Sequence, residues 1–299
     1  MEKRQLGKTD MQVSLLGFGG SEIGFEGVSE ETVALLLKSA LDAGLNVIDT
    51  GECYEGSEEL IGKAVSDRRQ DYYLFTKCGH PRGIGSEDWS PNSLLESIER
   101  SLRRLKTDRL DLIQLHSCSE AVLRKGDAIA ALQTAKGKGY ARYIGYSGDS
   151  LPAKFAVECG AFDTLQTSIN IADQEAIELT LPRARERQMG VIAKRPIANA
   201  AWKEKHKPID SYQHPYWNRL SKLHYEFIRE CPLEESIARA LRFTLSVPGV
   251  HTAIVGTTKP DRWLQNAQMI EAGLLSDAEF QAIRERWDDV APATWIGQT

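Results

Sequence analysis

The chain has 299 residues, of which 41% are hydrophobic and 26% charged, and its formal net charge is −5 at pH 7. This is an ordinary globular composition, and its mild acidity gives no electrostatic reason to expect nucleic acid or an anionic membrane as a partner. The five cysteines are an odd number without a CxxC pair, which argues against a disulfide framework and against a structural metal site. The polar opening MEKRQLGKTD does not resemble a secretory signal, and no apolar run approaches the ~18 residues of a membrane span, so we expect a cytoplasmic protein.

Short apolar strands alternate with amphipathic helices along the chain. The opening KRQLGKTDMQVS predicts a hairpin that turns around Gly7 to Asp10. The strands that follow are predicted to end near Gly17, Asp49, Lys77, His116, Ser147, Gln166, Arg195 and Gly256. Helical periods lie between them, over residues 31–45 and 91–105 for example, the second with Ser90 as N-cap and Pro91 in its first position.

Eight such strands alternating with helices over roughly 250 residues predict an α/β fold, a (β/α)8 TIM barrel, as a single domain over residues 1–299. The stretch from Pro196 to Pro232 is too long for a simple connection, so we expect a long loop after strand 7 that lies over the barrel mouth. A Rossmann fold is the competing interpretation, because LLGFGGSEIG follows a strand and precedes a helix. Its glycines depart from the G-x-G-x-x-G pattern and Asp49 lies too far beyond them, which favours the barrel.

Polar side chains mark the ends of three predicted strands. Asp49, Lys77 and His116 each end an apolar run, and Tyr54 follows the first of them in a glycine-flanked loop. Taken singly, each has an ordinary explanation: a helix cap, a lysine that reaches the surface, a satisfied core histidine, or a half-exposed packing tyrosine. On a barrel, however, the carboxyl ends of the strands converge on the face where active sites form. We therefore expect the four side chains to lie together as a proton-transfer set.

The chemistry of this set follows from its ionisable groups. An unperturbed tyrosine has a pKa near ~10, and a neighbouring ammonium lowers it by stabilising the phenolate. The lysine must itself be kept charged in a partly dry cavity, which a carboxylate achieves, and a histidine can hydrogen-bond a substrate oxygen. Such a site protonates an oxygen on which negative charge is building. A carbonyl that receives a hydride from a nicotinamide develops that charge.

The chain resembles the aldo-keto reductase superfamily from RQLGKTDMQVSLLGFG to about Asn266, and the segment DTGECYEGSEE is similar to the family's most characteristic motif. The resemblance implies a catalytic tetrad of Asp49, Tyr54, Lys77 and His116. Tyr54 is then the general acid, Lys77 the partner that lowers its pKa, Asp49 the anchor of Lys77, and His116 the residue that orients the carbonyl. It also implies a barrel that binds NADPH in extended form without a Rossmann domain.

Further residues are implied at the cofactor. Gln166 matches the family residue that holds the nicotinamide carboxamide, and Ser147 matches the first half of a Ser-Asn pair. The partner is missing because Gly148 stands where the family usually has Asn, which leaves Asp149 or a water to substitute. Near strand 7, many members place an aromatic residue before Ser-Pro to stack on the nicotinamide, whereas this chain has Lys194-Arg195-Pro196. A guanidinium can also stack on a ring or contact phosphate, so Arg195 is the candidate for this role.

The segment IVGTTKPDRWLQN resembles the family's adenosine-phosphate site. Its threonines and lysine are expected at the start of a helix led by Pro260, where free N–H groups favour an anion. Arg262 is expected one turn in, able to bind the 2′-phosphate, with Asn266 one turn further on toward adenine. The ordinary alternative is a capped surface helix with incidental basic residues. The cofactor residues implied here and in the glycine-rich first strand are Gly19, Gly20, Gly256, Thr257, Thr258, Lys259, Arg262 and Asn266.

The substrate is expected to be a small carbonyl compound, with no nucleic acid, membrane or metal involved. Aromatic residues in loops near the mouth suit an apolar substrate, although each could equally serve loop packing. They are Trp89, Trp202, Tyr216, Trp217 and the C-terminal Trp295. Two functions remain open: an NADPH-dependent carbonyl reductase, and a cofactor-binding regulatory subunit like the reductase-like β subunits of potassium channels. The complete tetrad and the lack of a long N-terminal extension favour the enzyme.

Overall fold

Eight parallel strands form a closed barrel in the computed structural model, which describes residues 1–204 and 206–298. Their order around the barrel is β10-β3-β4-β5-β6-β7-β8-β9. The strands are β3 (Leu16–Gly19), β4 (Val47–Asp49), β5 (Tyr73–Cys78), β6 (Leu110–His116), β7 (Ala141–Ser147), β8 (Thr164–Ser168), β9 (Gly190–Lys194) and β10 (Thr252–Gly256). The predicted (β/α)8 barrel is confirmed, and the Rossmann alternative is excluded.

The strand register places residues that are far apart in the sequence side by side at the carboxyl ends of the strands. Gly256 of β10 pairs with Gly19 of β3, which pairs with Asp49 of β4. On the other side of the barrel, His116 pairs with Ser147 and Ser147 with Gln166. Because parallel strands share one carboxyl edge, these residues belong to one ring at the barrel mouth.

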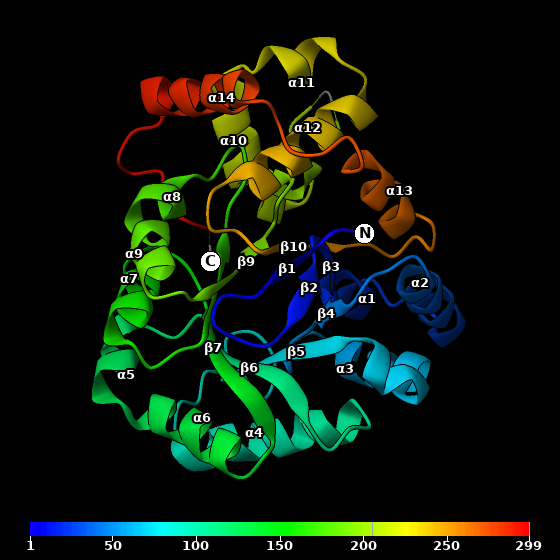
Figure 1. The fold of residues 1–299 in the computed structure, drawn as a ribbon, viewed down its shortest axis with the longest axis vertical. Helices are drawn as coiled ribbons and strands as arrows, with labels where there is room; N and C mark the ends of the chain where they lie inside the picture. Colours follow the sequence, from blue (N-terminus) through cyan, green and yellow to red (C-terminus); the bar gives the residue numbers. More distant parts are fainter. Residues whose placement is uncertain (205, 299) are drawn as a thin grey trace.

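Helices surround the barrel (Figure 1). They are α1 (Ser21–Phe25), α2 (Glu30–Asp42), α3 (Ser57–Val65), α4 (Pro91–Arg104), α5 (Glu120–Lys125), α6 (Asp127–Gly137), α7 (Ser150–Cys159), α8 (Glu175–Leu179), α9 (Leu181–Glu186), α10 (His214–Leu223), α11 (Glu226–Glu230), α12 (Leu233–Ser246), α13 (Arg262–Met269) and α14 (Asp277–Val290). Local signals define their starts, as when the Ser29 side chain accepts a hydrogen bond from Thr32 N ahead of α2. Ser276 and Glu279 form a capping box at α14.

The N-terminal hairpin, β1 (Lys3–Gln5) with β2 (Gln12–Ser14), is confirmed as an extra two-stranded sheet. Its Leu6, Met11 and Val13 are fully buried. They pack against one end of the barrel interior, whose residues in this cluster are Val47, Phe75, Leu112, Ile192 and Ile254. The turn needs a glycine, because Gly7 has a φ of +56° and a Cβ there would lie 2.2 Å from Gly190 N. The hairpin therefore closes this end of the barrel.

The long connection after β9 is confirmed and carries helical structure. It contains 3-10 turns at Ala198–Ala200 and Ser211–Gln213, followed by α10 and α11. In Figure 1, α10 and α11 lie at the same end of the molecule as α14. The Arg286 side chain of α14 donates to the Leu223 carbonyl at the end of α10 over 2.6 Å. Within the described ranges, no helix is long and apolar enough to cross a membrane.

Candidate active site

The four residues of the predicted tetrad lie together at the carboxyl ends of β4, β5 and β6. Lys77 Nζ donates to Asp49 Oδ2 and, over 2.7 Å, to the carbonyl oxygen of Thr50. The same ammonium lies 5.0 Å from the centroid of the Tyr54 ring. The Tyr54 and His116 rings meet edge to face, with their centroids 5.8 Å apart. Three strands and the loop after β4 thus place an acid, a cation, a carboxylate and an imidazole in one cluster.

Burial makes the lysine–aspartate pair necessary. The side chains of Lys77 and Asp49 are 1% and 2% exposed, and a buried ammonium without a partner would be strongly destabilising. The other Asp49 oxygen, Oδ1, accepts from Gln166 Nε2 at 2.8 Å and from Gln114 Nε2 at 3.3 Å. The carboxylate is therefore fixed from both sides, and it fixes Lys77.

Burial and neighbouring charges shift the proton affinities of the cluster. Burial raises the pKa of Tyr54 to about 12, and the Lys77 ammonium acts against this rise. Lys77 therefore lowers the pKa of Tyr54 as expected, although the loss of solvent is the larger effect. Burial acts to lower the pKa of Lys77, but Asp49, Tyr54 and Cys53 together act against it, so that the pKa is raised. Burial and the Lys77 charge hold the pKa of His116 well below its ordinary range, so the imidazole is neutral at pH 7.

Two neighbours of His116 were not singled out from the sequence. The Cys53 thiol lies 3.4 Å from His116 Nδ1, and His80 Nε2 lies 2.9 Å from the His116 carbonyl oxygen. Burial raises the pKa of the Cys53 thiol to about 11, so it is protonated and can donate to Nδ1. No sequence signal pairs Cys53 with His116, because the contact spans 63 residues.

The ends of β7 and β8 hold the predicted carboxamide site. Ser147 Oγ donates to Gln166 Oε1 over 3.0 Å, so both residues lie together beside Asp49. An asparagine does not fit at Gly148, because a Cβ there would lie 2.5 Å from the Tyr146 hydroxyl. Asp149 binds elsewhere: Thr167 Oγ1 and Ser168 N each donate to its Oδ1 at 2.7 Å. Asp149 is therefore held by contacts to the end of β8.

Two cations at the carboxyl end of β9, Lys194 and Arg195, have partners within the chain. Lys194 Nζ lies 2.8 Å from Asp149 Oδ2. Arg195 Nε donates to the Tyr212 hydroxyl over 2.7 Å, and its Nη1 donates to the Gln298 carbonyl oxygen. Arg195 also has a φ of +55°, a left-handed conformation that costs a non-glycine residue energy and is typical of functional sites. Pro196 follows it, and its carbonyl accepts from Thr244 Oγ1 at 2.8 Å.

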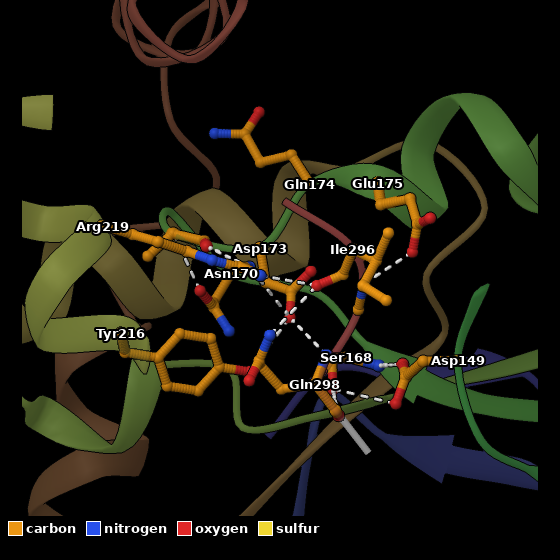
Figure 2. A network of polar contacts seen from close by, with 12 residues as sticks. Asp149, Ser168, Asn170, Asp173, Gln174, Glu175, Tyr216, Arg219, Ile296 and Gln298 are labelled. Carbon is orange, nitrogen blue, oxygen red and sulfur yellow. Dashed lines mark hydrogen bonds and ion pairs between the residues drawn. The ribbon is translucent and has the colours of Figure 1, made fainter. Parts of the chain in front are cut away.

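The C-terminal tail, with Ile296 and Gln298, lies among Asp173, Glu175 and Arg219 (Figure 2). Arg219 Nη2 donates to the Ile296 carbonyl over 2.6 Å, and Gly297 N donates to Glu175 Oε2 over 2.6 Å. Gln298 N donates to Asp173 Oδ2 over 3.1 Å. The tail thus reaches the ring of strand ends beside Arg195.

The predicted adenosine-phosphate segment lies at the end of β10. Gly256 is directly beside Gly19, while Thr257 and Asn266 are buried and Lys259 is exposed. The helix begins later than predicted: α13 starts at Arg262, after an N-cap at Asp261. Arg262 is therefore the first helical residue, with Asn266 one turn on from it. Residues 257–261 form the connection between strand and helix, and Lys259 N donates to Thr257 Oγ1 over 3.1 Å.

The predicted aromatic residues divide between the site and the surrounding packing. Trp89 lies 5.7 Å from His80, whose ring lies 5.3 Å from that of His116. Trp202 donates to Ser236 Oγ of α12 over 2.9 Å, a packing contact. Trp217 is half-buried and packs on the main core from α10. Trp295 lies 5.5 Å from Trp287 of α14, and the Tyr216 hydroxyl donates to Asp173.

Comparison with known proteins decides the family. The sequence profile of the Aldo/keto reductase family matches residues 15–288. The chain belongs to the aldo-keto reductases. It is 30% identical over 304 residues to the oxidoreductase YqkF of Bacillus subtilis, covering 95% of this chain and 96% of that one. It is 29% identical to the L-galactose dehydrogenase of Arabidopsis thaliana, covering 90% and 88% of the two chains. The holo form of the aldo-keto reductase AKR11C1 from Bacillus halodurans matches with a TM-score of 0.82 and 30% identity, covering 96% of each chain.

Membership makes this chain an NAD(P)H-dependent oxidoreductase, whose cofactor carries a nicotinamide ring, a pyrophosphate and an adenosine. Two features of the mouth suit that group. The Gln166 amide is held by Ser147 and Asp49 in one orientation, as a partner for a carboxamide should be. A Cβ built at Gly19 would meet only backbone atoms of Val255 and Gly256, at 3.4 Å or more, so no side chain covers this strand end and a ligand can approach it.

Proposed function

We propose that this aldo-keto reductase reduces an aldehyde or ketone to an alcohol with NADPH, using Tyr54 as general acid. The observation that carries the proposal is the contact set around Lys77: its ammonium binds Asp49 and lies 5.0 Å from the Tyr54 ring, which in turn meets His116. Such a set has the parts needed to protonate an oxygen, and the Lys77 ammonium counteracts the rise that burial causes in the pKa of Tyr54.

Each residue has one task in the proposed reaction. NADPH, when bound, supplies the hydride for the carbonyl carbon. The Tyr54 hydroxyl donates its proton to the carbonyl oxygen as negative charge develops there, and Lys77 stabilises the phenolate that remains. Asp49 keeps Lys77 charged and in place. The neutral His116 donates a hydrogen bond to the carbonyl oxygen from Nε2, because the Cys53 thiol is placed to occupy Nδ1.

The proposed cofactor contacts follow the strand ends. Ser147 and Gln166 bind the nicotinamide carboxamide, and Arg195 stacks on the ring with Lys194 and Pro196 beside it. Gly19, Gly20 and Gly256 border the phosphates, with Thr257, Thr258 and Lys259. Arg262 binds the 2′-phosphate and Asn266 the adenine. Trp89 is the proposed substrate contact, since it adjoins His80 and through it His116.

The test is a reaction of purified protein with NADPH and a panel of aldehydes, ketones, sugars and quinones, followed by the absorbance of the reduced nicotinamide. Consumption of NADPH that depends on a carbonyl compound supports the enzyme. NADPH binding without turnover of any carbonyl would support the regulatory alternative instead. A single domain over residues 1–299 and a cytoplasmic location are part of the same proposal.

A further inference from the structure

Helix α1 and the residue that follows it bring two carboxyl side chains to the segment proposed to hold the cofactor's phosphates. The Glu22 carboxylate covers Gly256 so closely that a Cβ on this glycine would lie 1.6 Å from Glu22 Oε2. Directly after α1, Glu26 Oε2 accepts a hydrogen bond from Thr258 Oγ1 at 3.0 Å. Both contacts join chain positions more than 230 residues apart. The carboxylates therefore lie on the same segment, Gly256–Thr258, from the side of β3.

The electrostatic setting of Glu22 is unfavourable for a carboxylate. Burial raises its pKa, and the neighbouring Glu26 adds to the effect, while a 2.7 Å hydrogen bond from Ser21 Oγ opposes it. Among the ion pairs of residues 1–204 and 206–298, none includes Glu22, Glu26, Lys259 or Arg262. Thus two carboxyl side chains contact the segment proposed to bind the phosphates, and neither is paired with the nearby cations Lys259 and Arg262.

We propose that Glu22 is an intramolecular competitor of the cofactor's phosphates, which holds the Gly256–Thr258 segment and must move away when a phosphate binds there. The inference rests on the proposed placement of the cofactor. A phosphate and a carboxylate cannot share one poorly solvated site, because like charges at short range disfavour each other. Binding must therefore include the displacement of Glu22, and this lowers the affinity for every ligand whose phosphate occupies the segment.

An opposite role has to be separated from this one. In dinucleotide-binding folds a carboxylate can accept a hydrogen bond from a ribose hydroxyl, and it then strengthens binding. Loss of the Glu22 charge would weaken cofactor binding in that case. The contact with Gly256 favours displacement, because the carboxylate covers the backbone itself and leaves no room over the glycine. The direction of the change in affinity distinguishes the two roles.

The experiment measures dissociation constants of NADPH, NADH and 2′,5′-ADP for wild-type protein and for Glu22→Gln, by isothermal titration. We expect the variant to bind NADPH and 2′,5′-ADP about tenfold more tightly, the effect of like-charge repulsion worth one pKa unit. Glu271→Gln is the matched control: Glu271 is exposed just beyond the far end of α13, and we expect unchanged affinities there. If Glu22→Gln increases the affinity for NADH as much as that for NADPH, Glu22 competes with the pyrophosphate. If only NADPH and 2′,5′-ADP bind more tightly, Glu22 competes with the 2′-phosphate. Both outcomes support the inference.

Unchanged or weaker binding by Glu22→Gln would overturn it. Glu22→Asp provides a second variant if Glu22→Gln does not fold, because it keeps the charge but withdraws it from Gly256, and we expect a smaller tightening. A wild-type protein that binds neither NADPH nor 2′,5′-ADP would contradict the proposed function itself. A wild type that binds both, with variants indistinguishable from it, would contradict only the role of Glu22.

Discussion

At the scale of single residues, two opposing effects act on the pKa of the Tyr54 phenol. Burial raises its pKa to about 12, and the Lys77 ammonium opposes the rise. We predict that Tyr54→Phe lowers kcat by about 10²- to 10⁴-fold, because only the proton donor is lost. NADPH affinity should stay within a few-fold of wild type, as fluorescence titration can measure.

The control for this substitution is Tyr73→Phe. The Tyr73 hydroxyl accepts from Gln12 N of the hairpin, at the amino end of β5, so its loss removes a hydroxyl far from the mouth. Tyr73→Phe should leave kcat unchanged. Substantial reductase activity in Tyr54→Phe would contradict the role assigned to this residue.

Arg262 is the second residue with a specific prediction. As the first residue of α13, it presents a guanidinium where the helix N-terminus also favours an anion. We predict that Arg262→Ala raises the dissociation constant of NADPH roughly ten- to hundredfold, since a charge-assisted hydrogen bond contributes about 1.5–3 kcal/mol. The constant for NADH should change far less. Gln265→Ala, an exposed position on the same helix, should affect neither, and equal weakening of both cofactors by Arg262→Ala would show that Arg262 does not bind the 2′-phosphate.

At the scale of elements, glycines decide how closely the outer helices approach. Gly62 of α3 faces the end of α4, where a Cβ would lie 2.2 Å from the Arg104 carbonyl oxygen. That neighbour is backbone, so the helices must move apart to admit a methyl group. We predict that Gly62→Ala lowers the free energy of unfolding by about 1–3 kcal/mol, measured in urea.

Gly137 is the matched position. It ends α6, it is exposed, and a Cβ there would meet nothing within 4 Å. Gly137→Ala should stabilise the protein by about 0.4–1 kcal/mol, because alanine loses less conformational entropy on folding. Similar effects of the two substitutions would mean that helix propensity, and not the contact between α3 and α4, decides the outcome at Gly62.

At the scale of the whole molecule, Asp173 joins three distant segments. It follows β8, and its Oδ2 accepts from the Tyr216 hydroxyl of α10 and from Gln298 N of the tail, both at 3.1 Å. Figure 2 shows these side chains with Arg219, whose Nη1 lies 3.7 Å from the same oxygen. Burial raises the pKa of Asp173 to about 7, and Arg219 opposes the shift. The contacts that fix the tail therefore depend on a carboxyl group with an abnormal proton affinity.

This pKa predicts a pH dependence of stability. In the unfolded chain the group titrates near ~3.9, so between about pH 4 and 7 the folded state binds more protons than the unfolded state. The contribution of Asp173 to stability is complete below that window and is lost as the pH rises through it. The Asp173→Asn variant has no ionisable group at this position. The difference between its melting temperature and that of the wild type should therefore shift in favour of the variant as the pH rises from about 5 to 8.

The exposed Asp108→Asn controls for the chemical change, and its difference from wild type should not vary with pH in this way. A constant difference for Asp173→Asn across the same range would show that the carboxyl group does not titrate there in the folded protein. Thermal unfolding followed by circular dichroism in matched buffers measures both variants.

The sequence by itself determined the fold and predicted which four side chains lie together at the barrel mouth. β6 and β10 have the predicted carboxyl ends at His116 and Gly256, because runs such as LDLIQLH and TAIVG carry their strand signal locally. The tetrad could be predicted because each member lies at or just after a strand end, and a barrel brings strand ends together. The later start of α13 escaped prediction, since residues 257–261 carry helix-start signals but form a connection.

Only the tertiary structure decided the partners of these residues. Lys194 pairs with Asp149, Cys53 contacts His116, Gln298 reaches Arg195, and Glu22 covers Gly256. Each contact joins side chains or backbone from different elements, and no spacing along the chain encodes it. The pKa of Tyr54 also depends on burial, which the whole fold sets and which the positions of Tyr54 and Lys77 in the sequence do not encode.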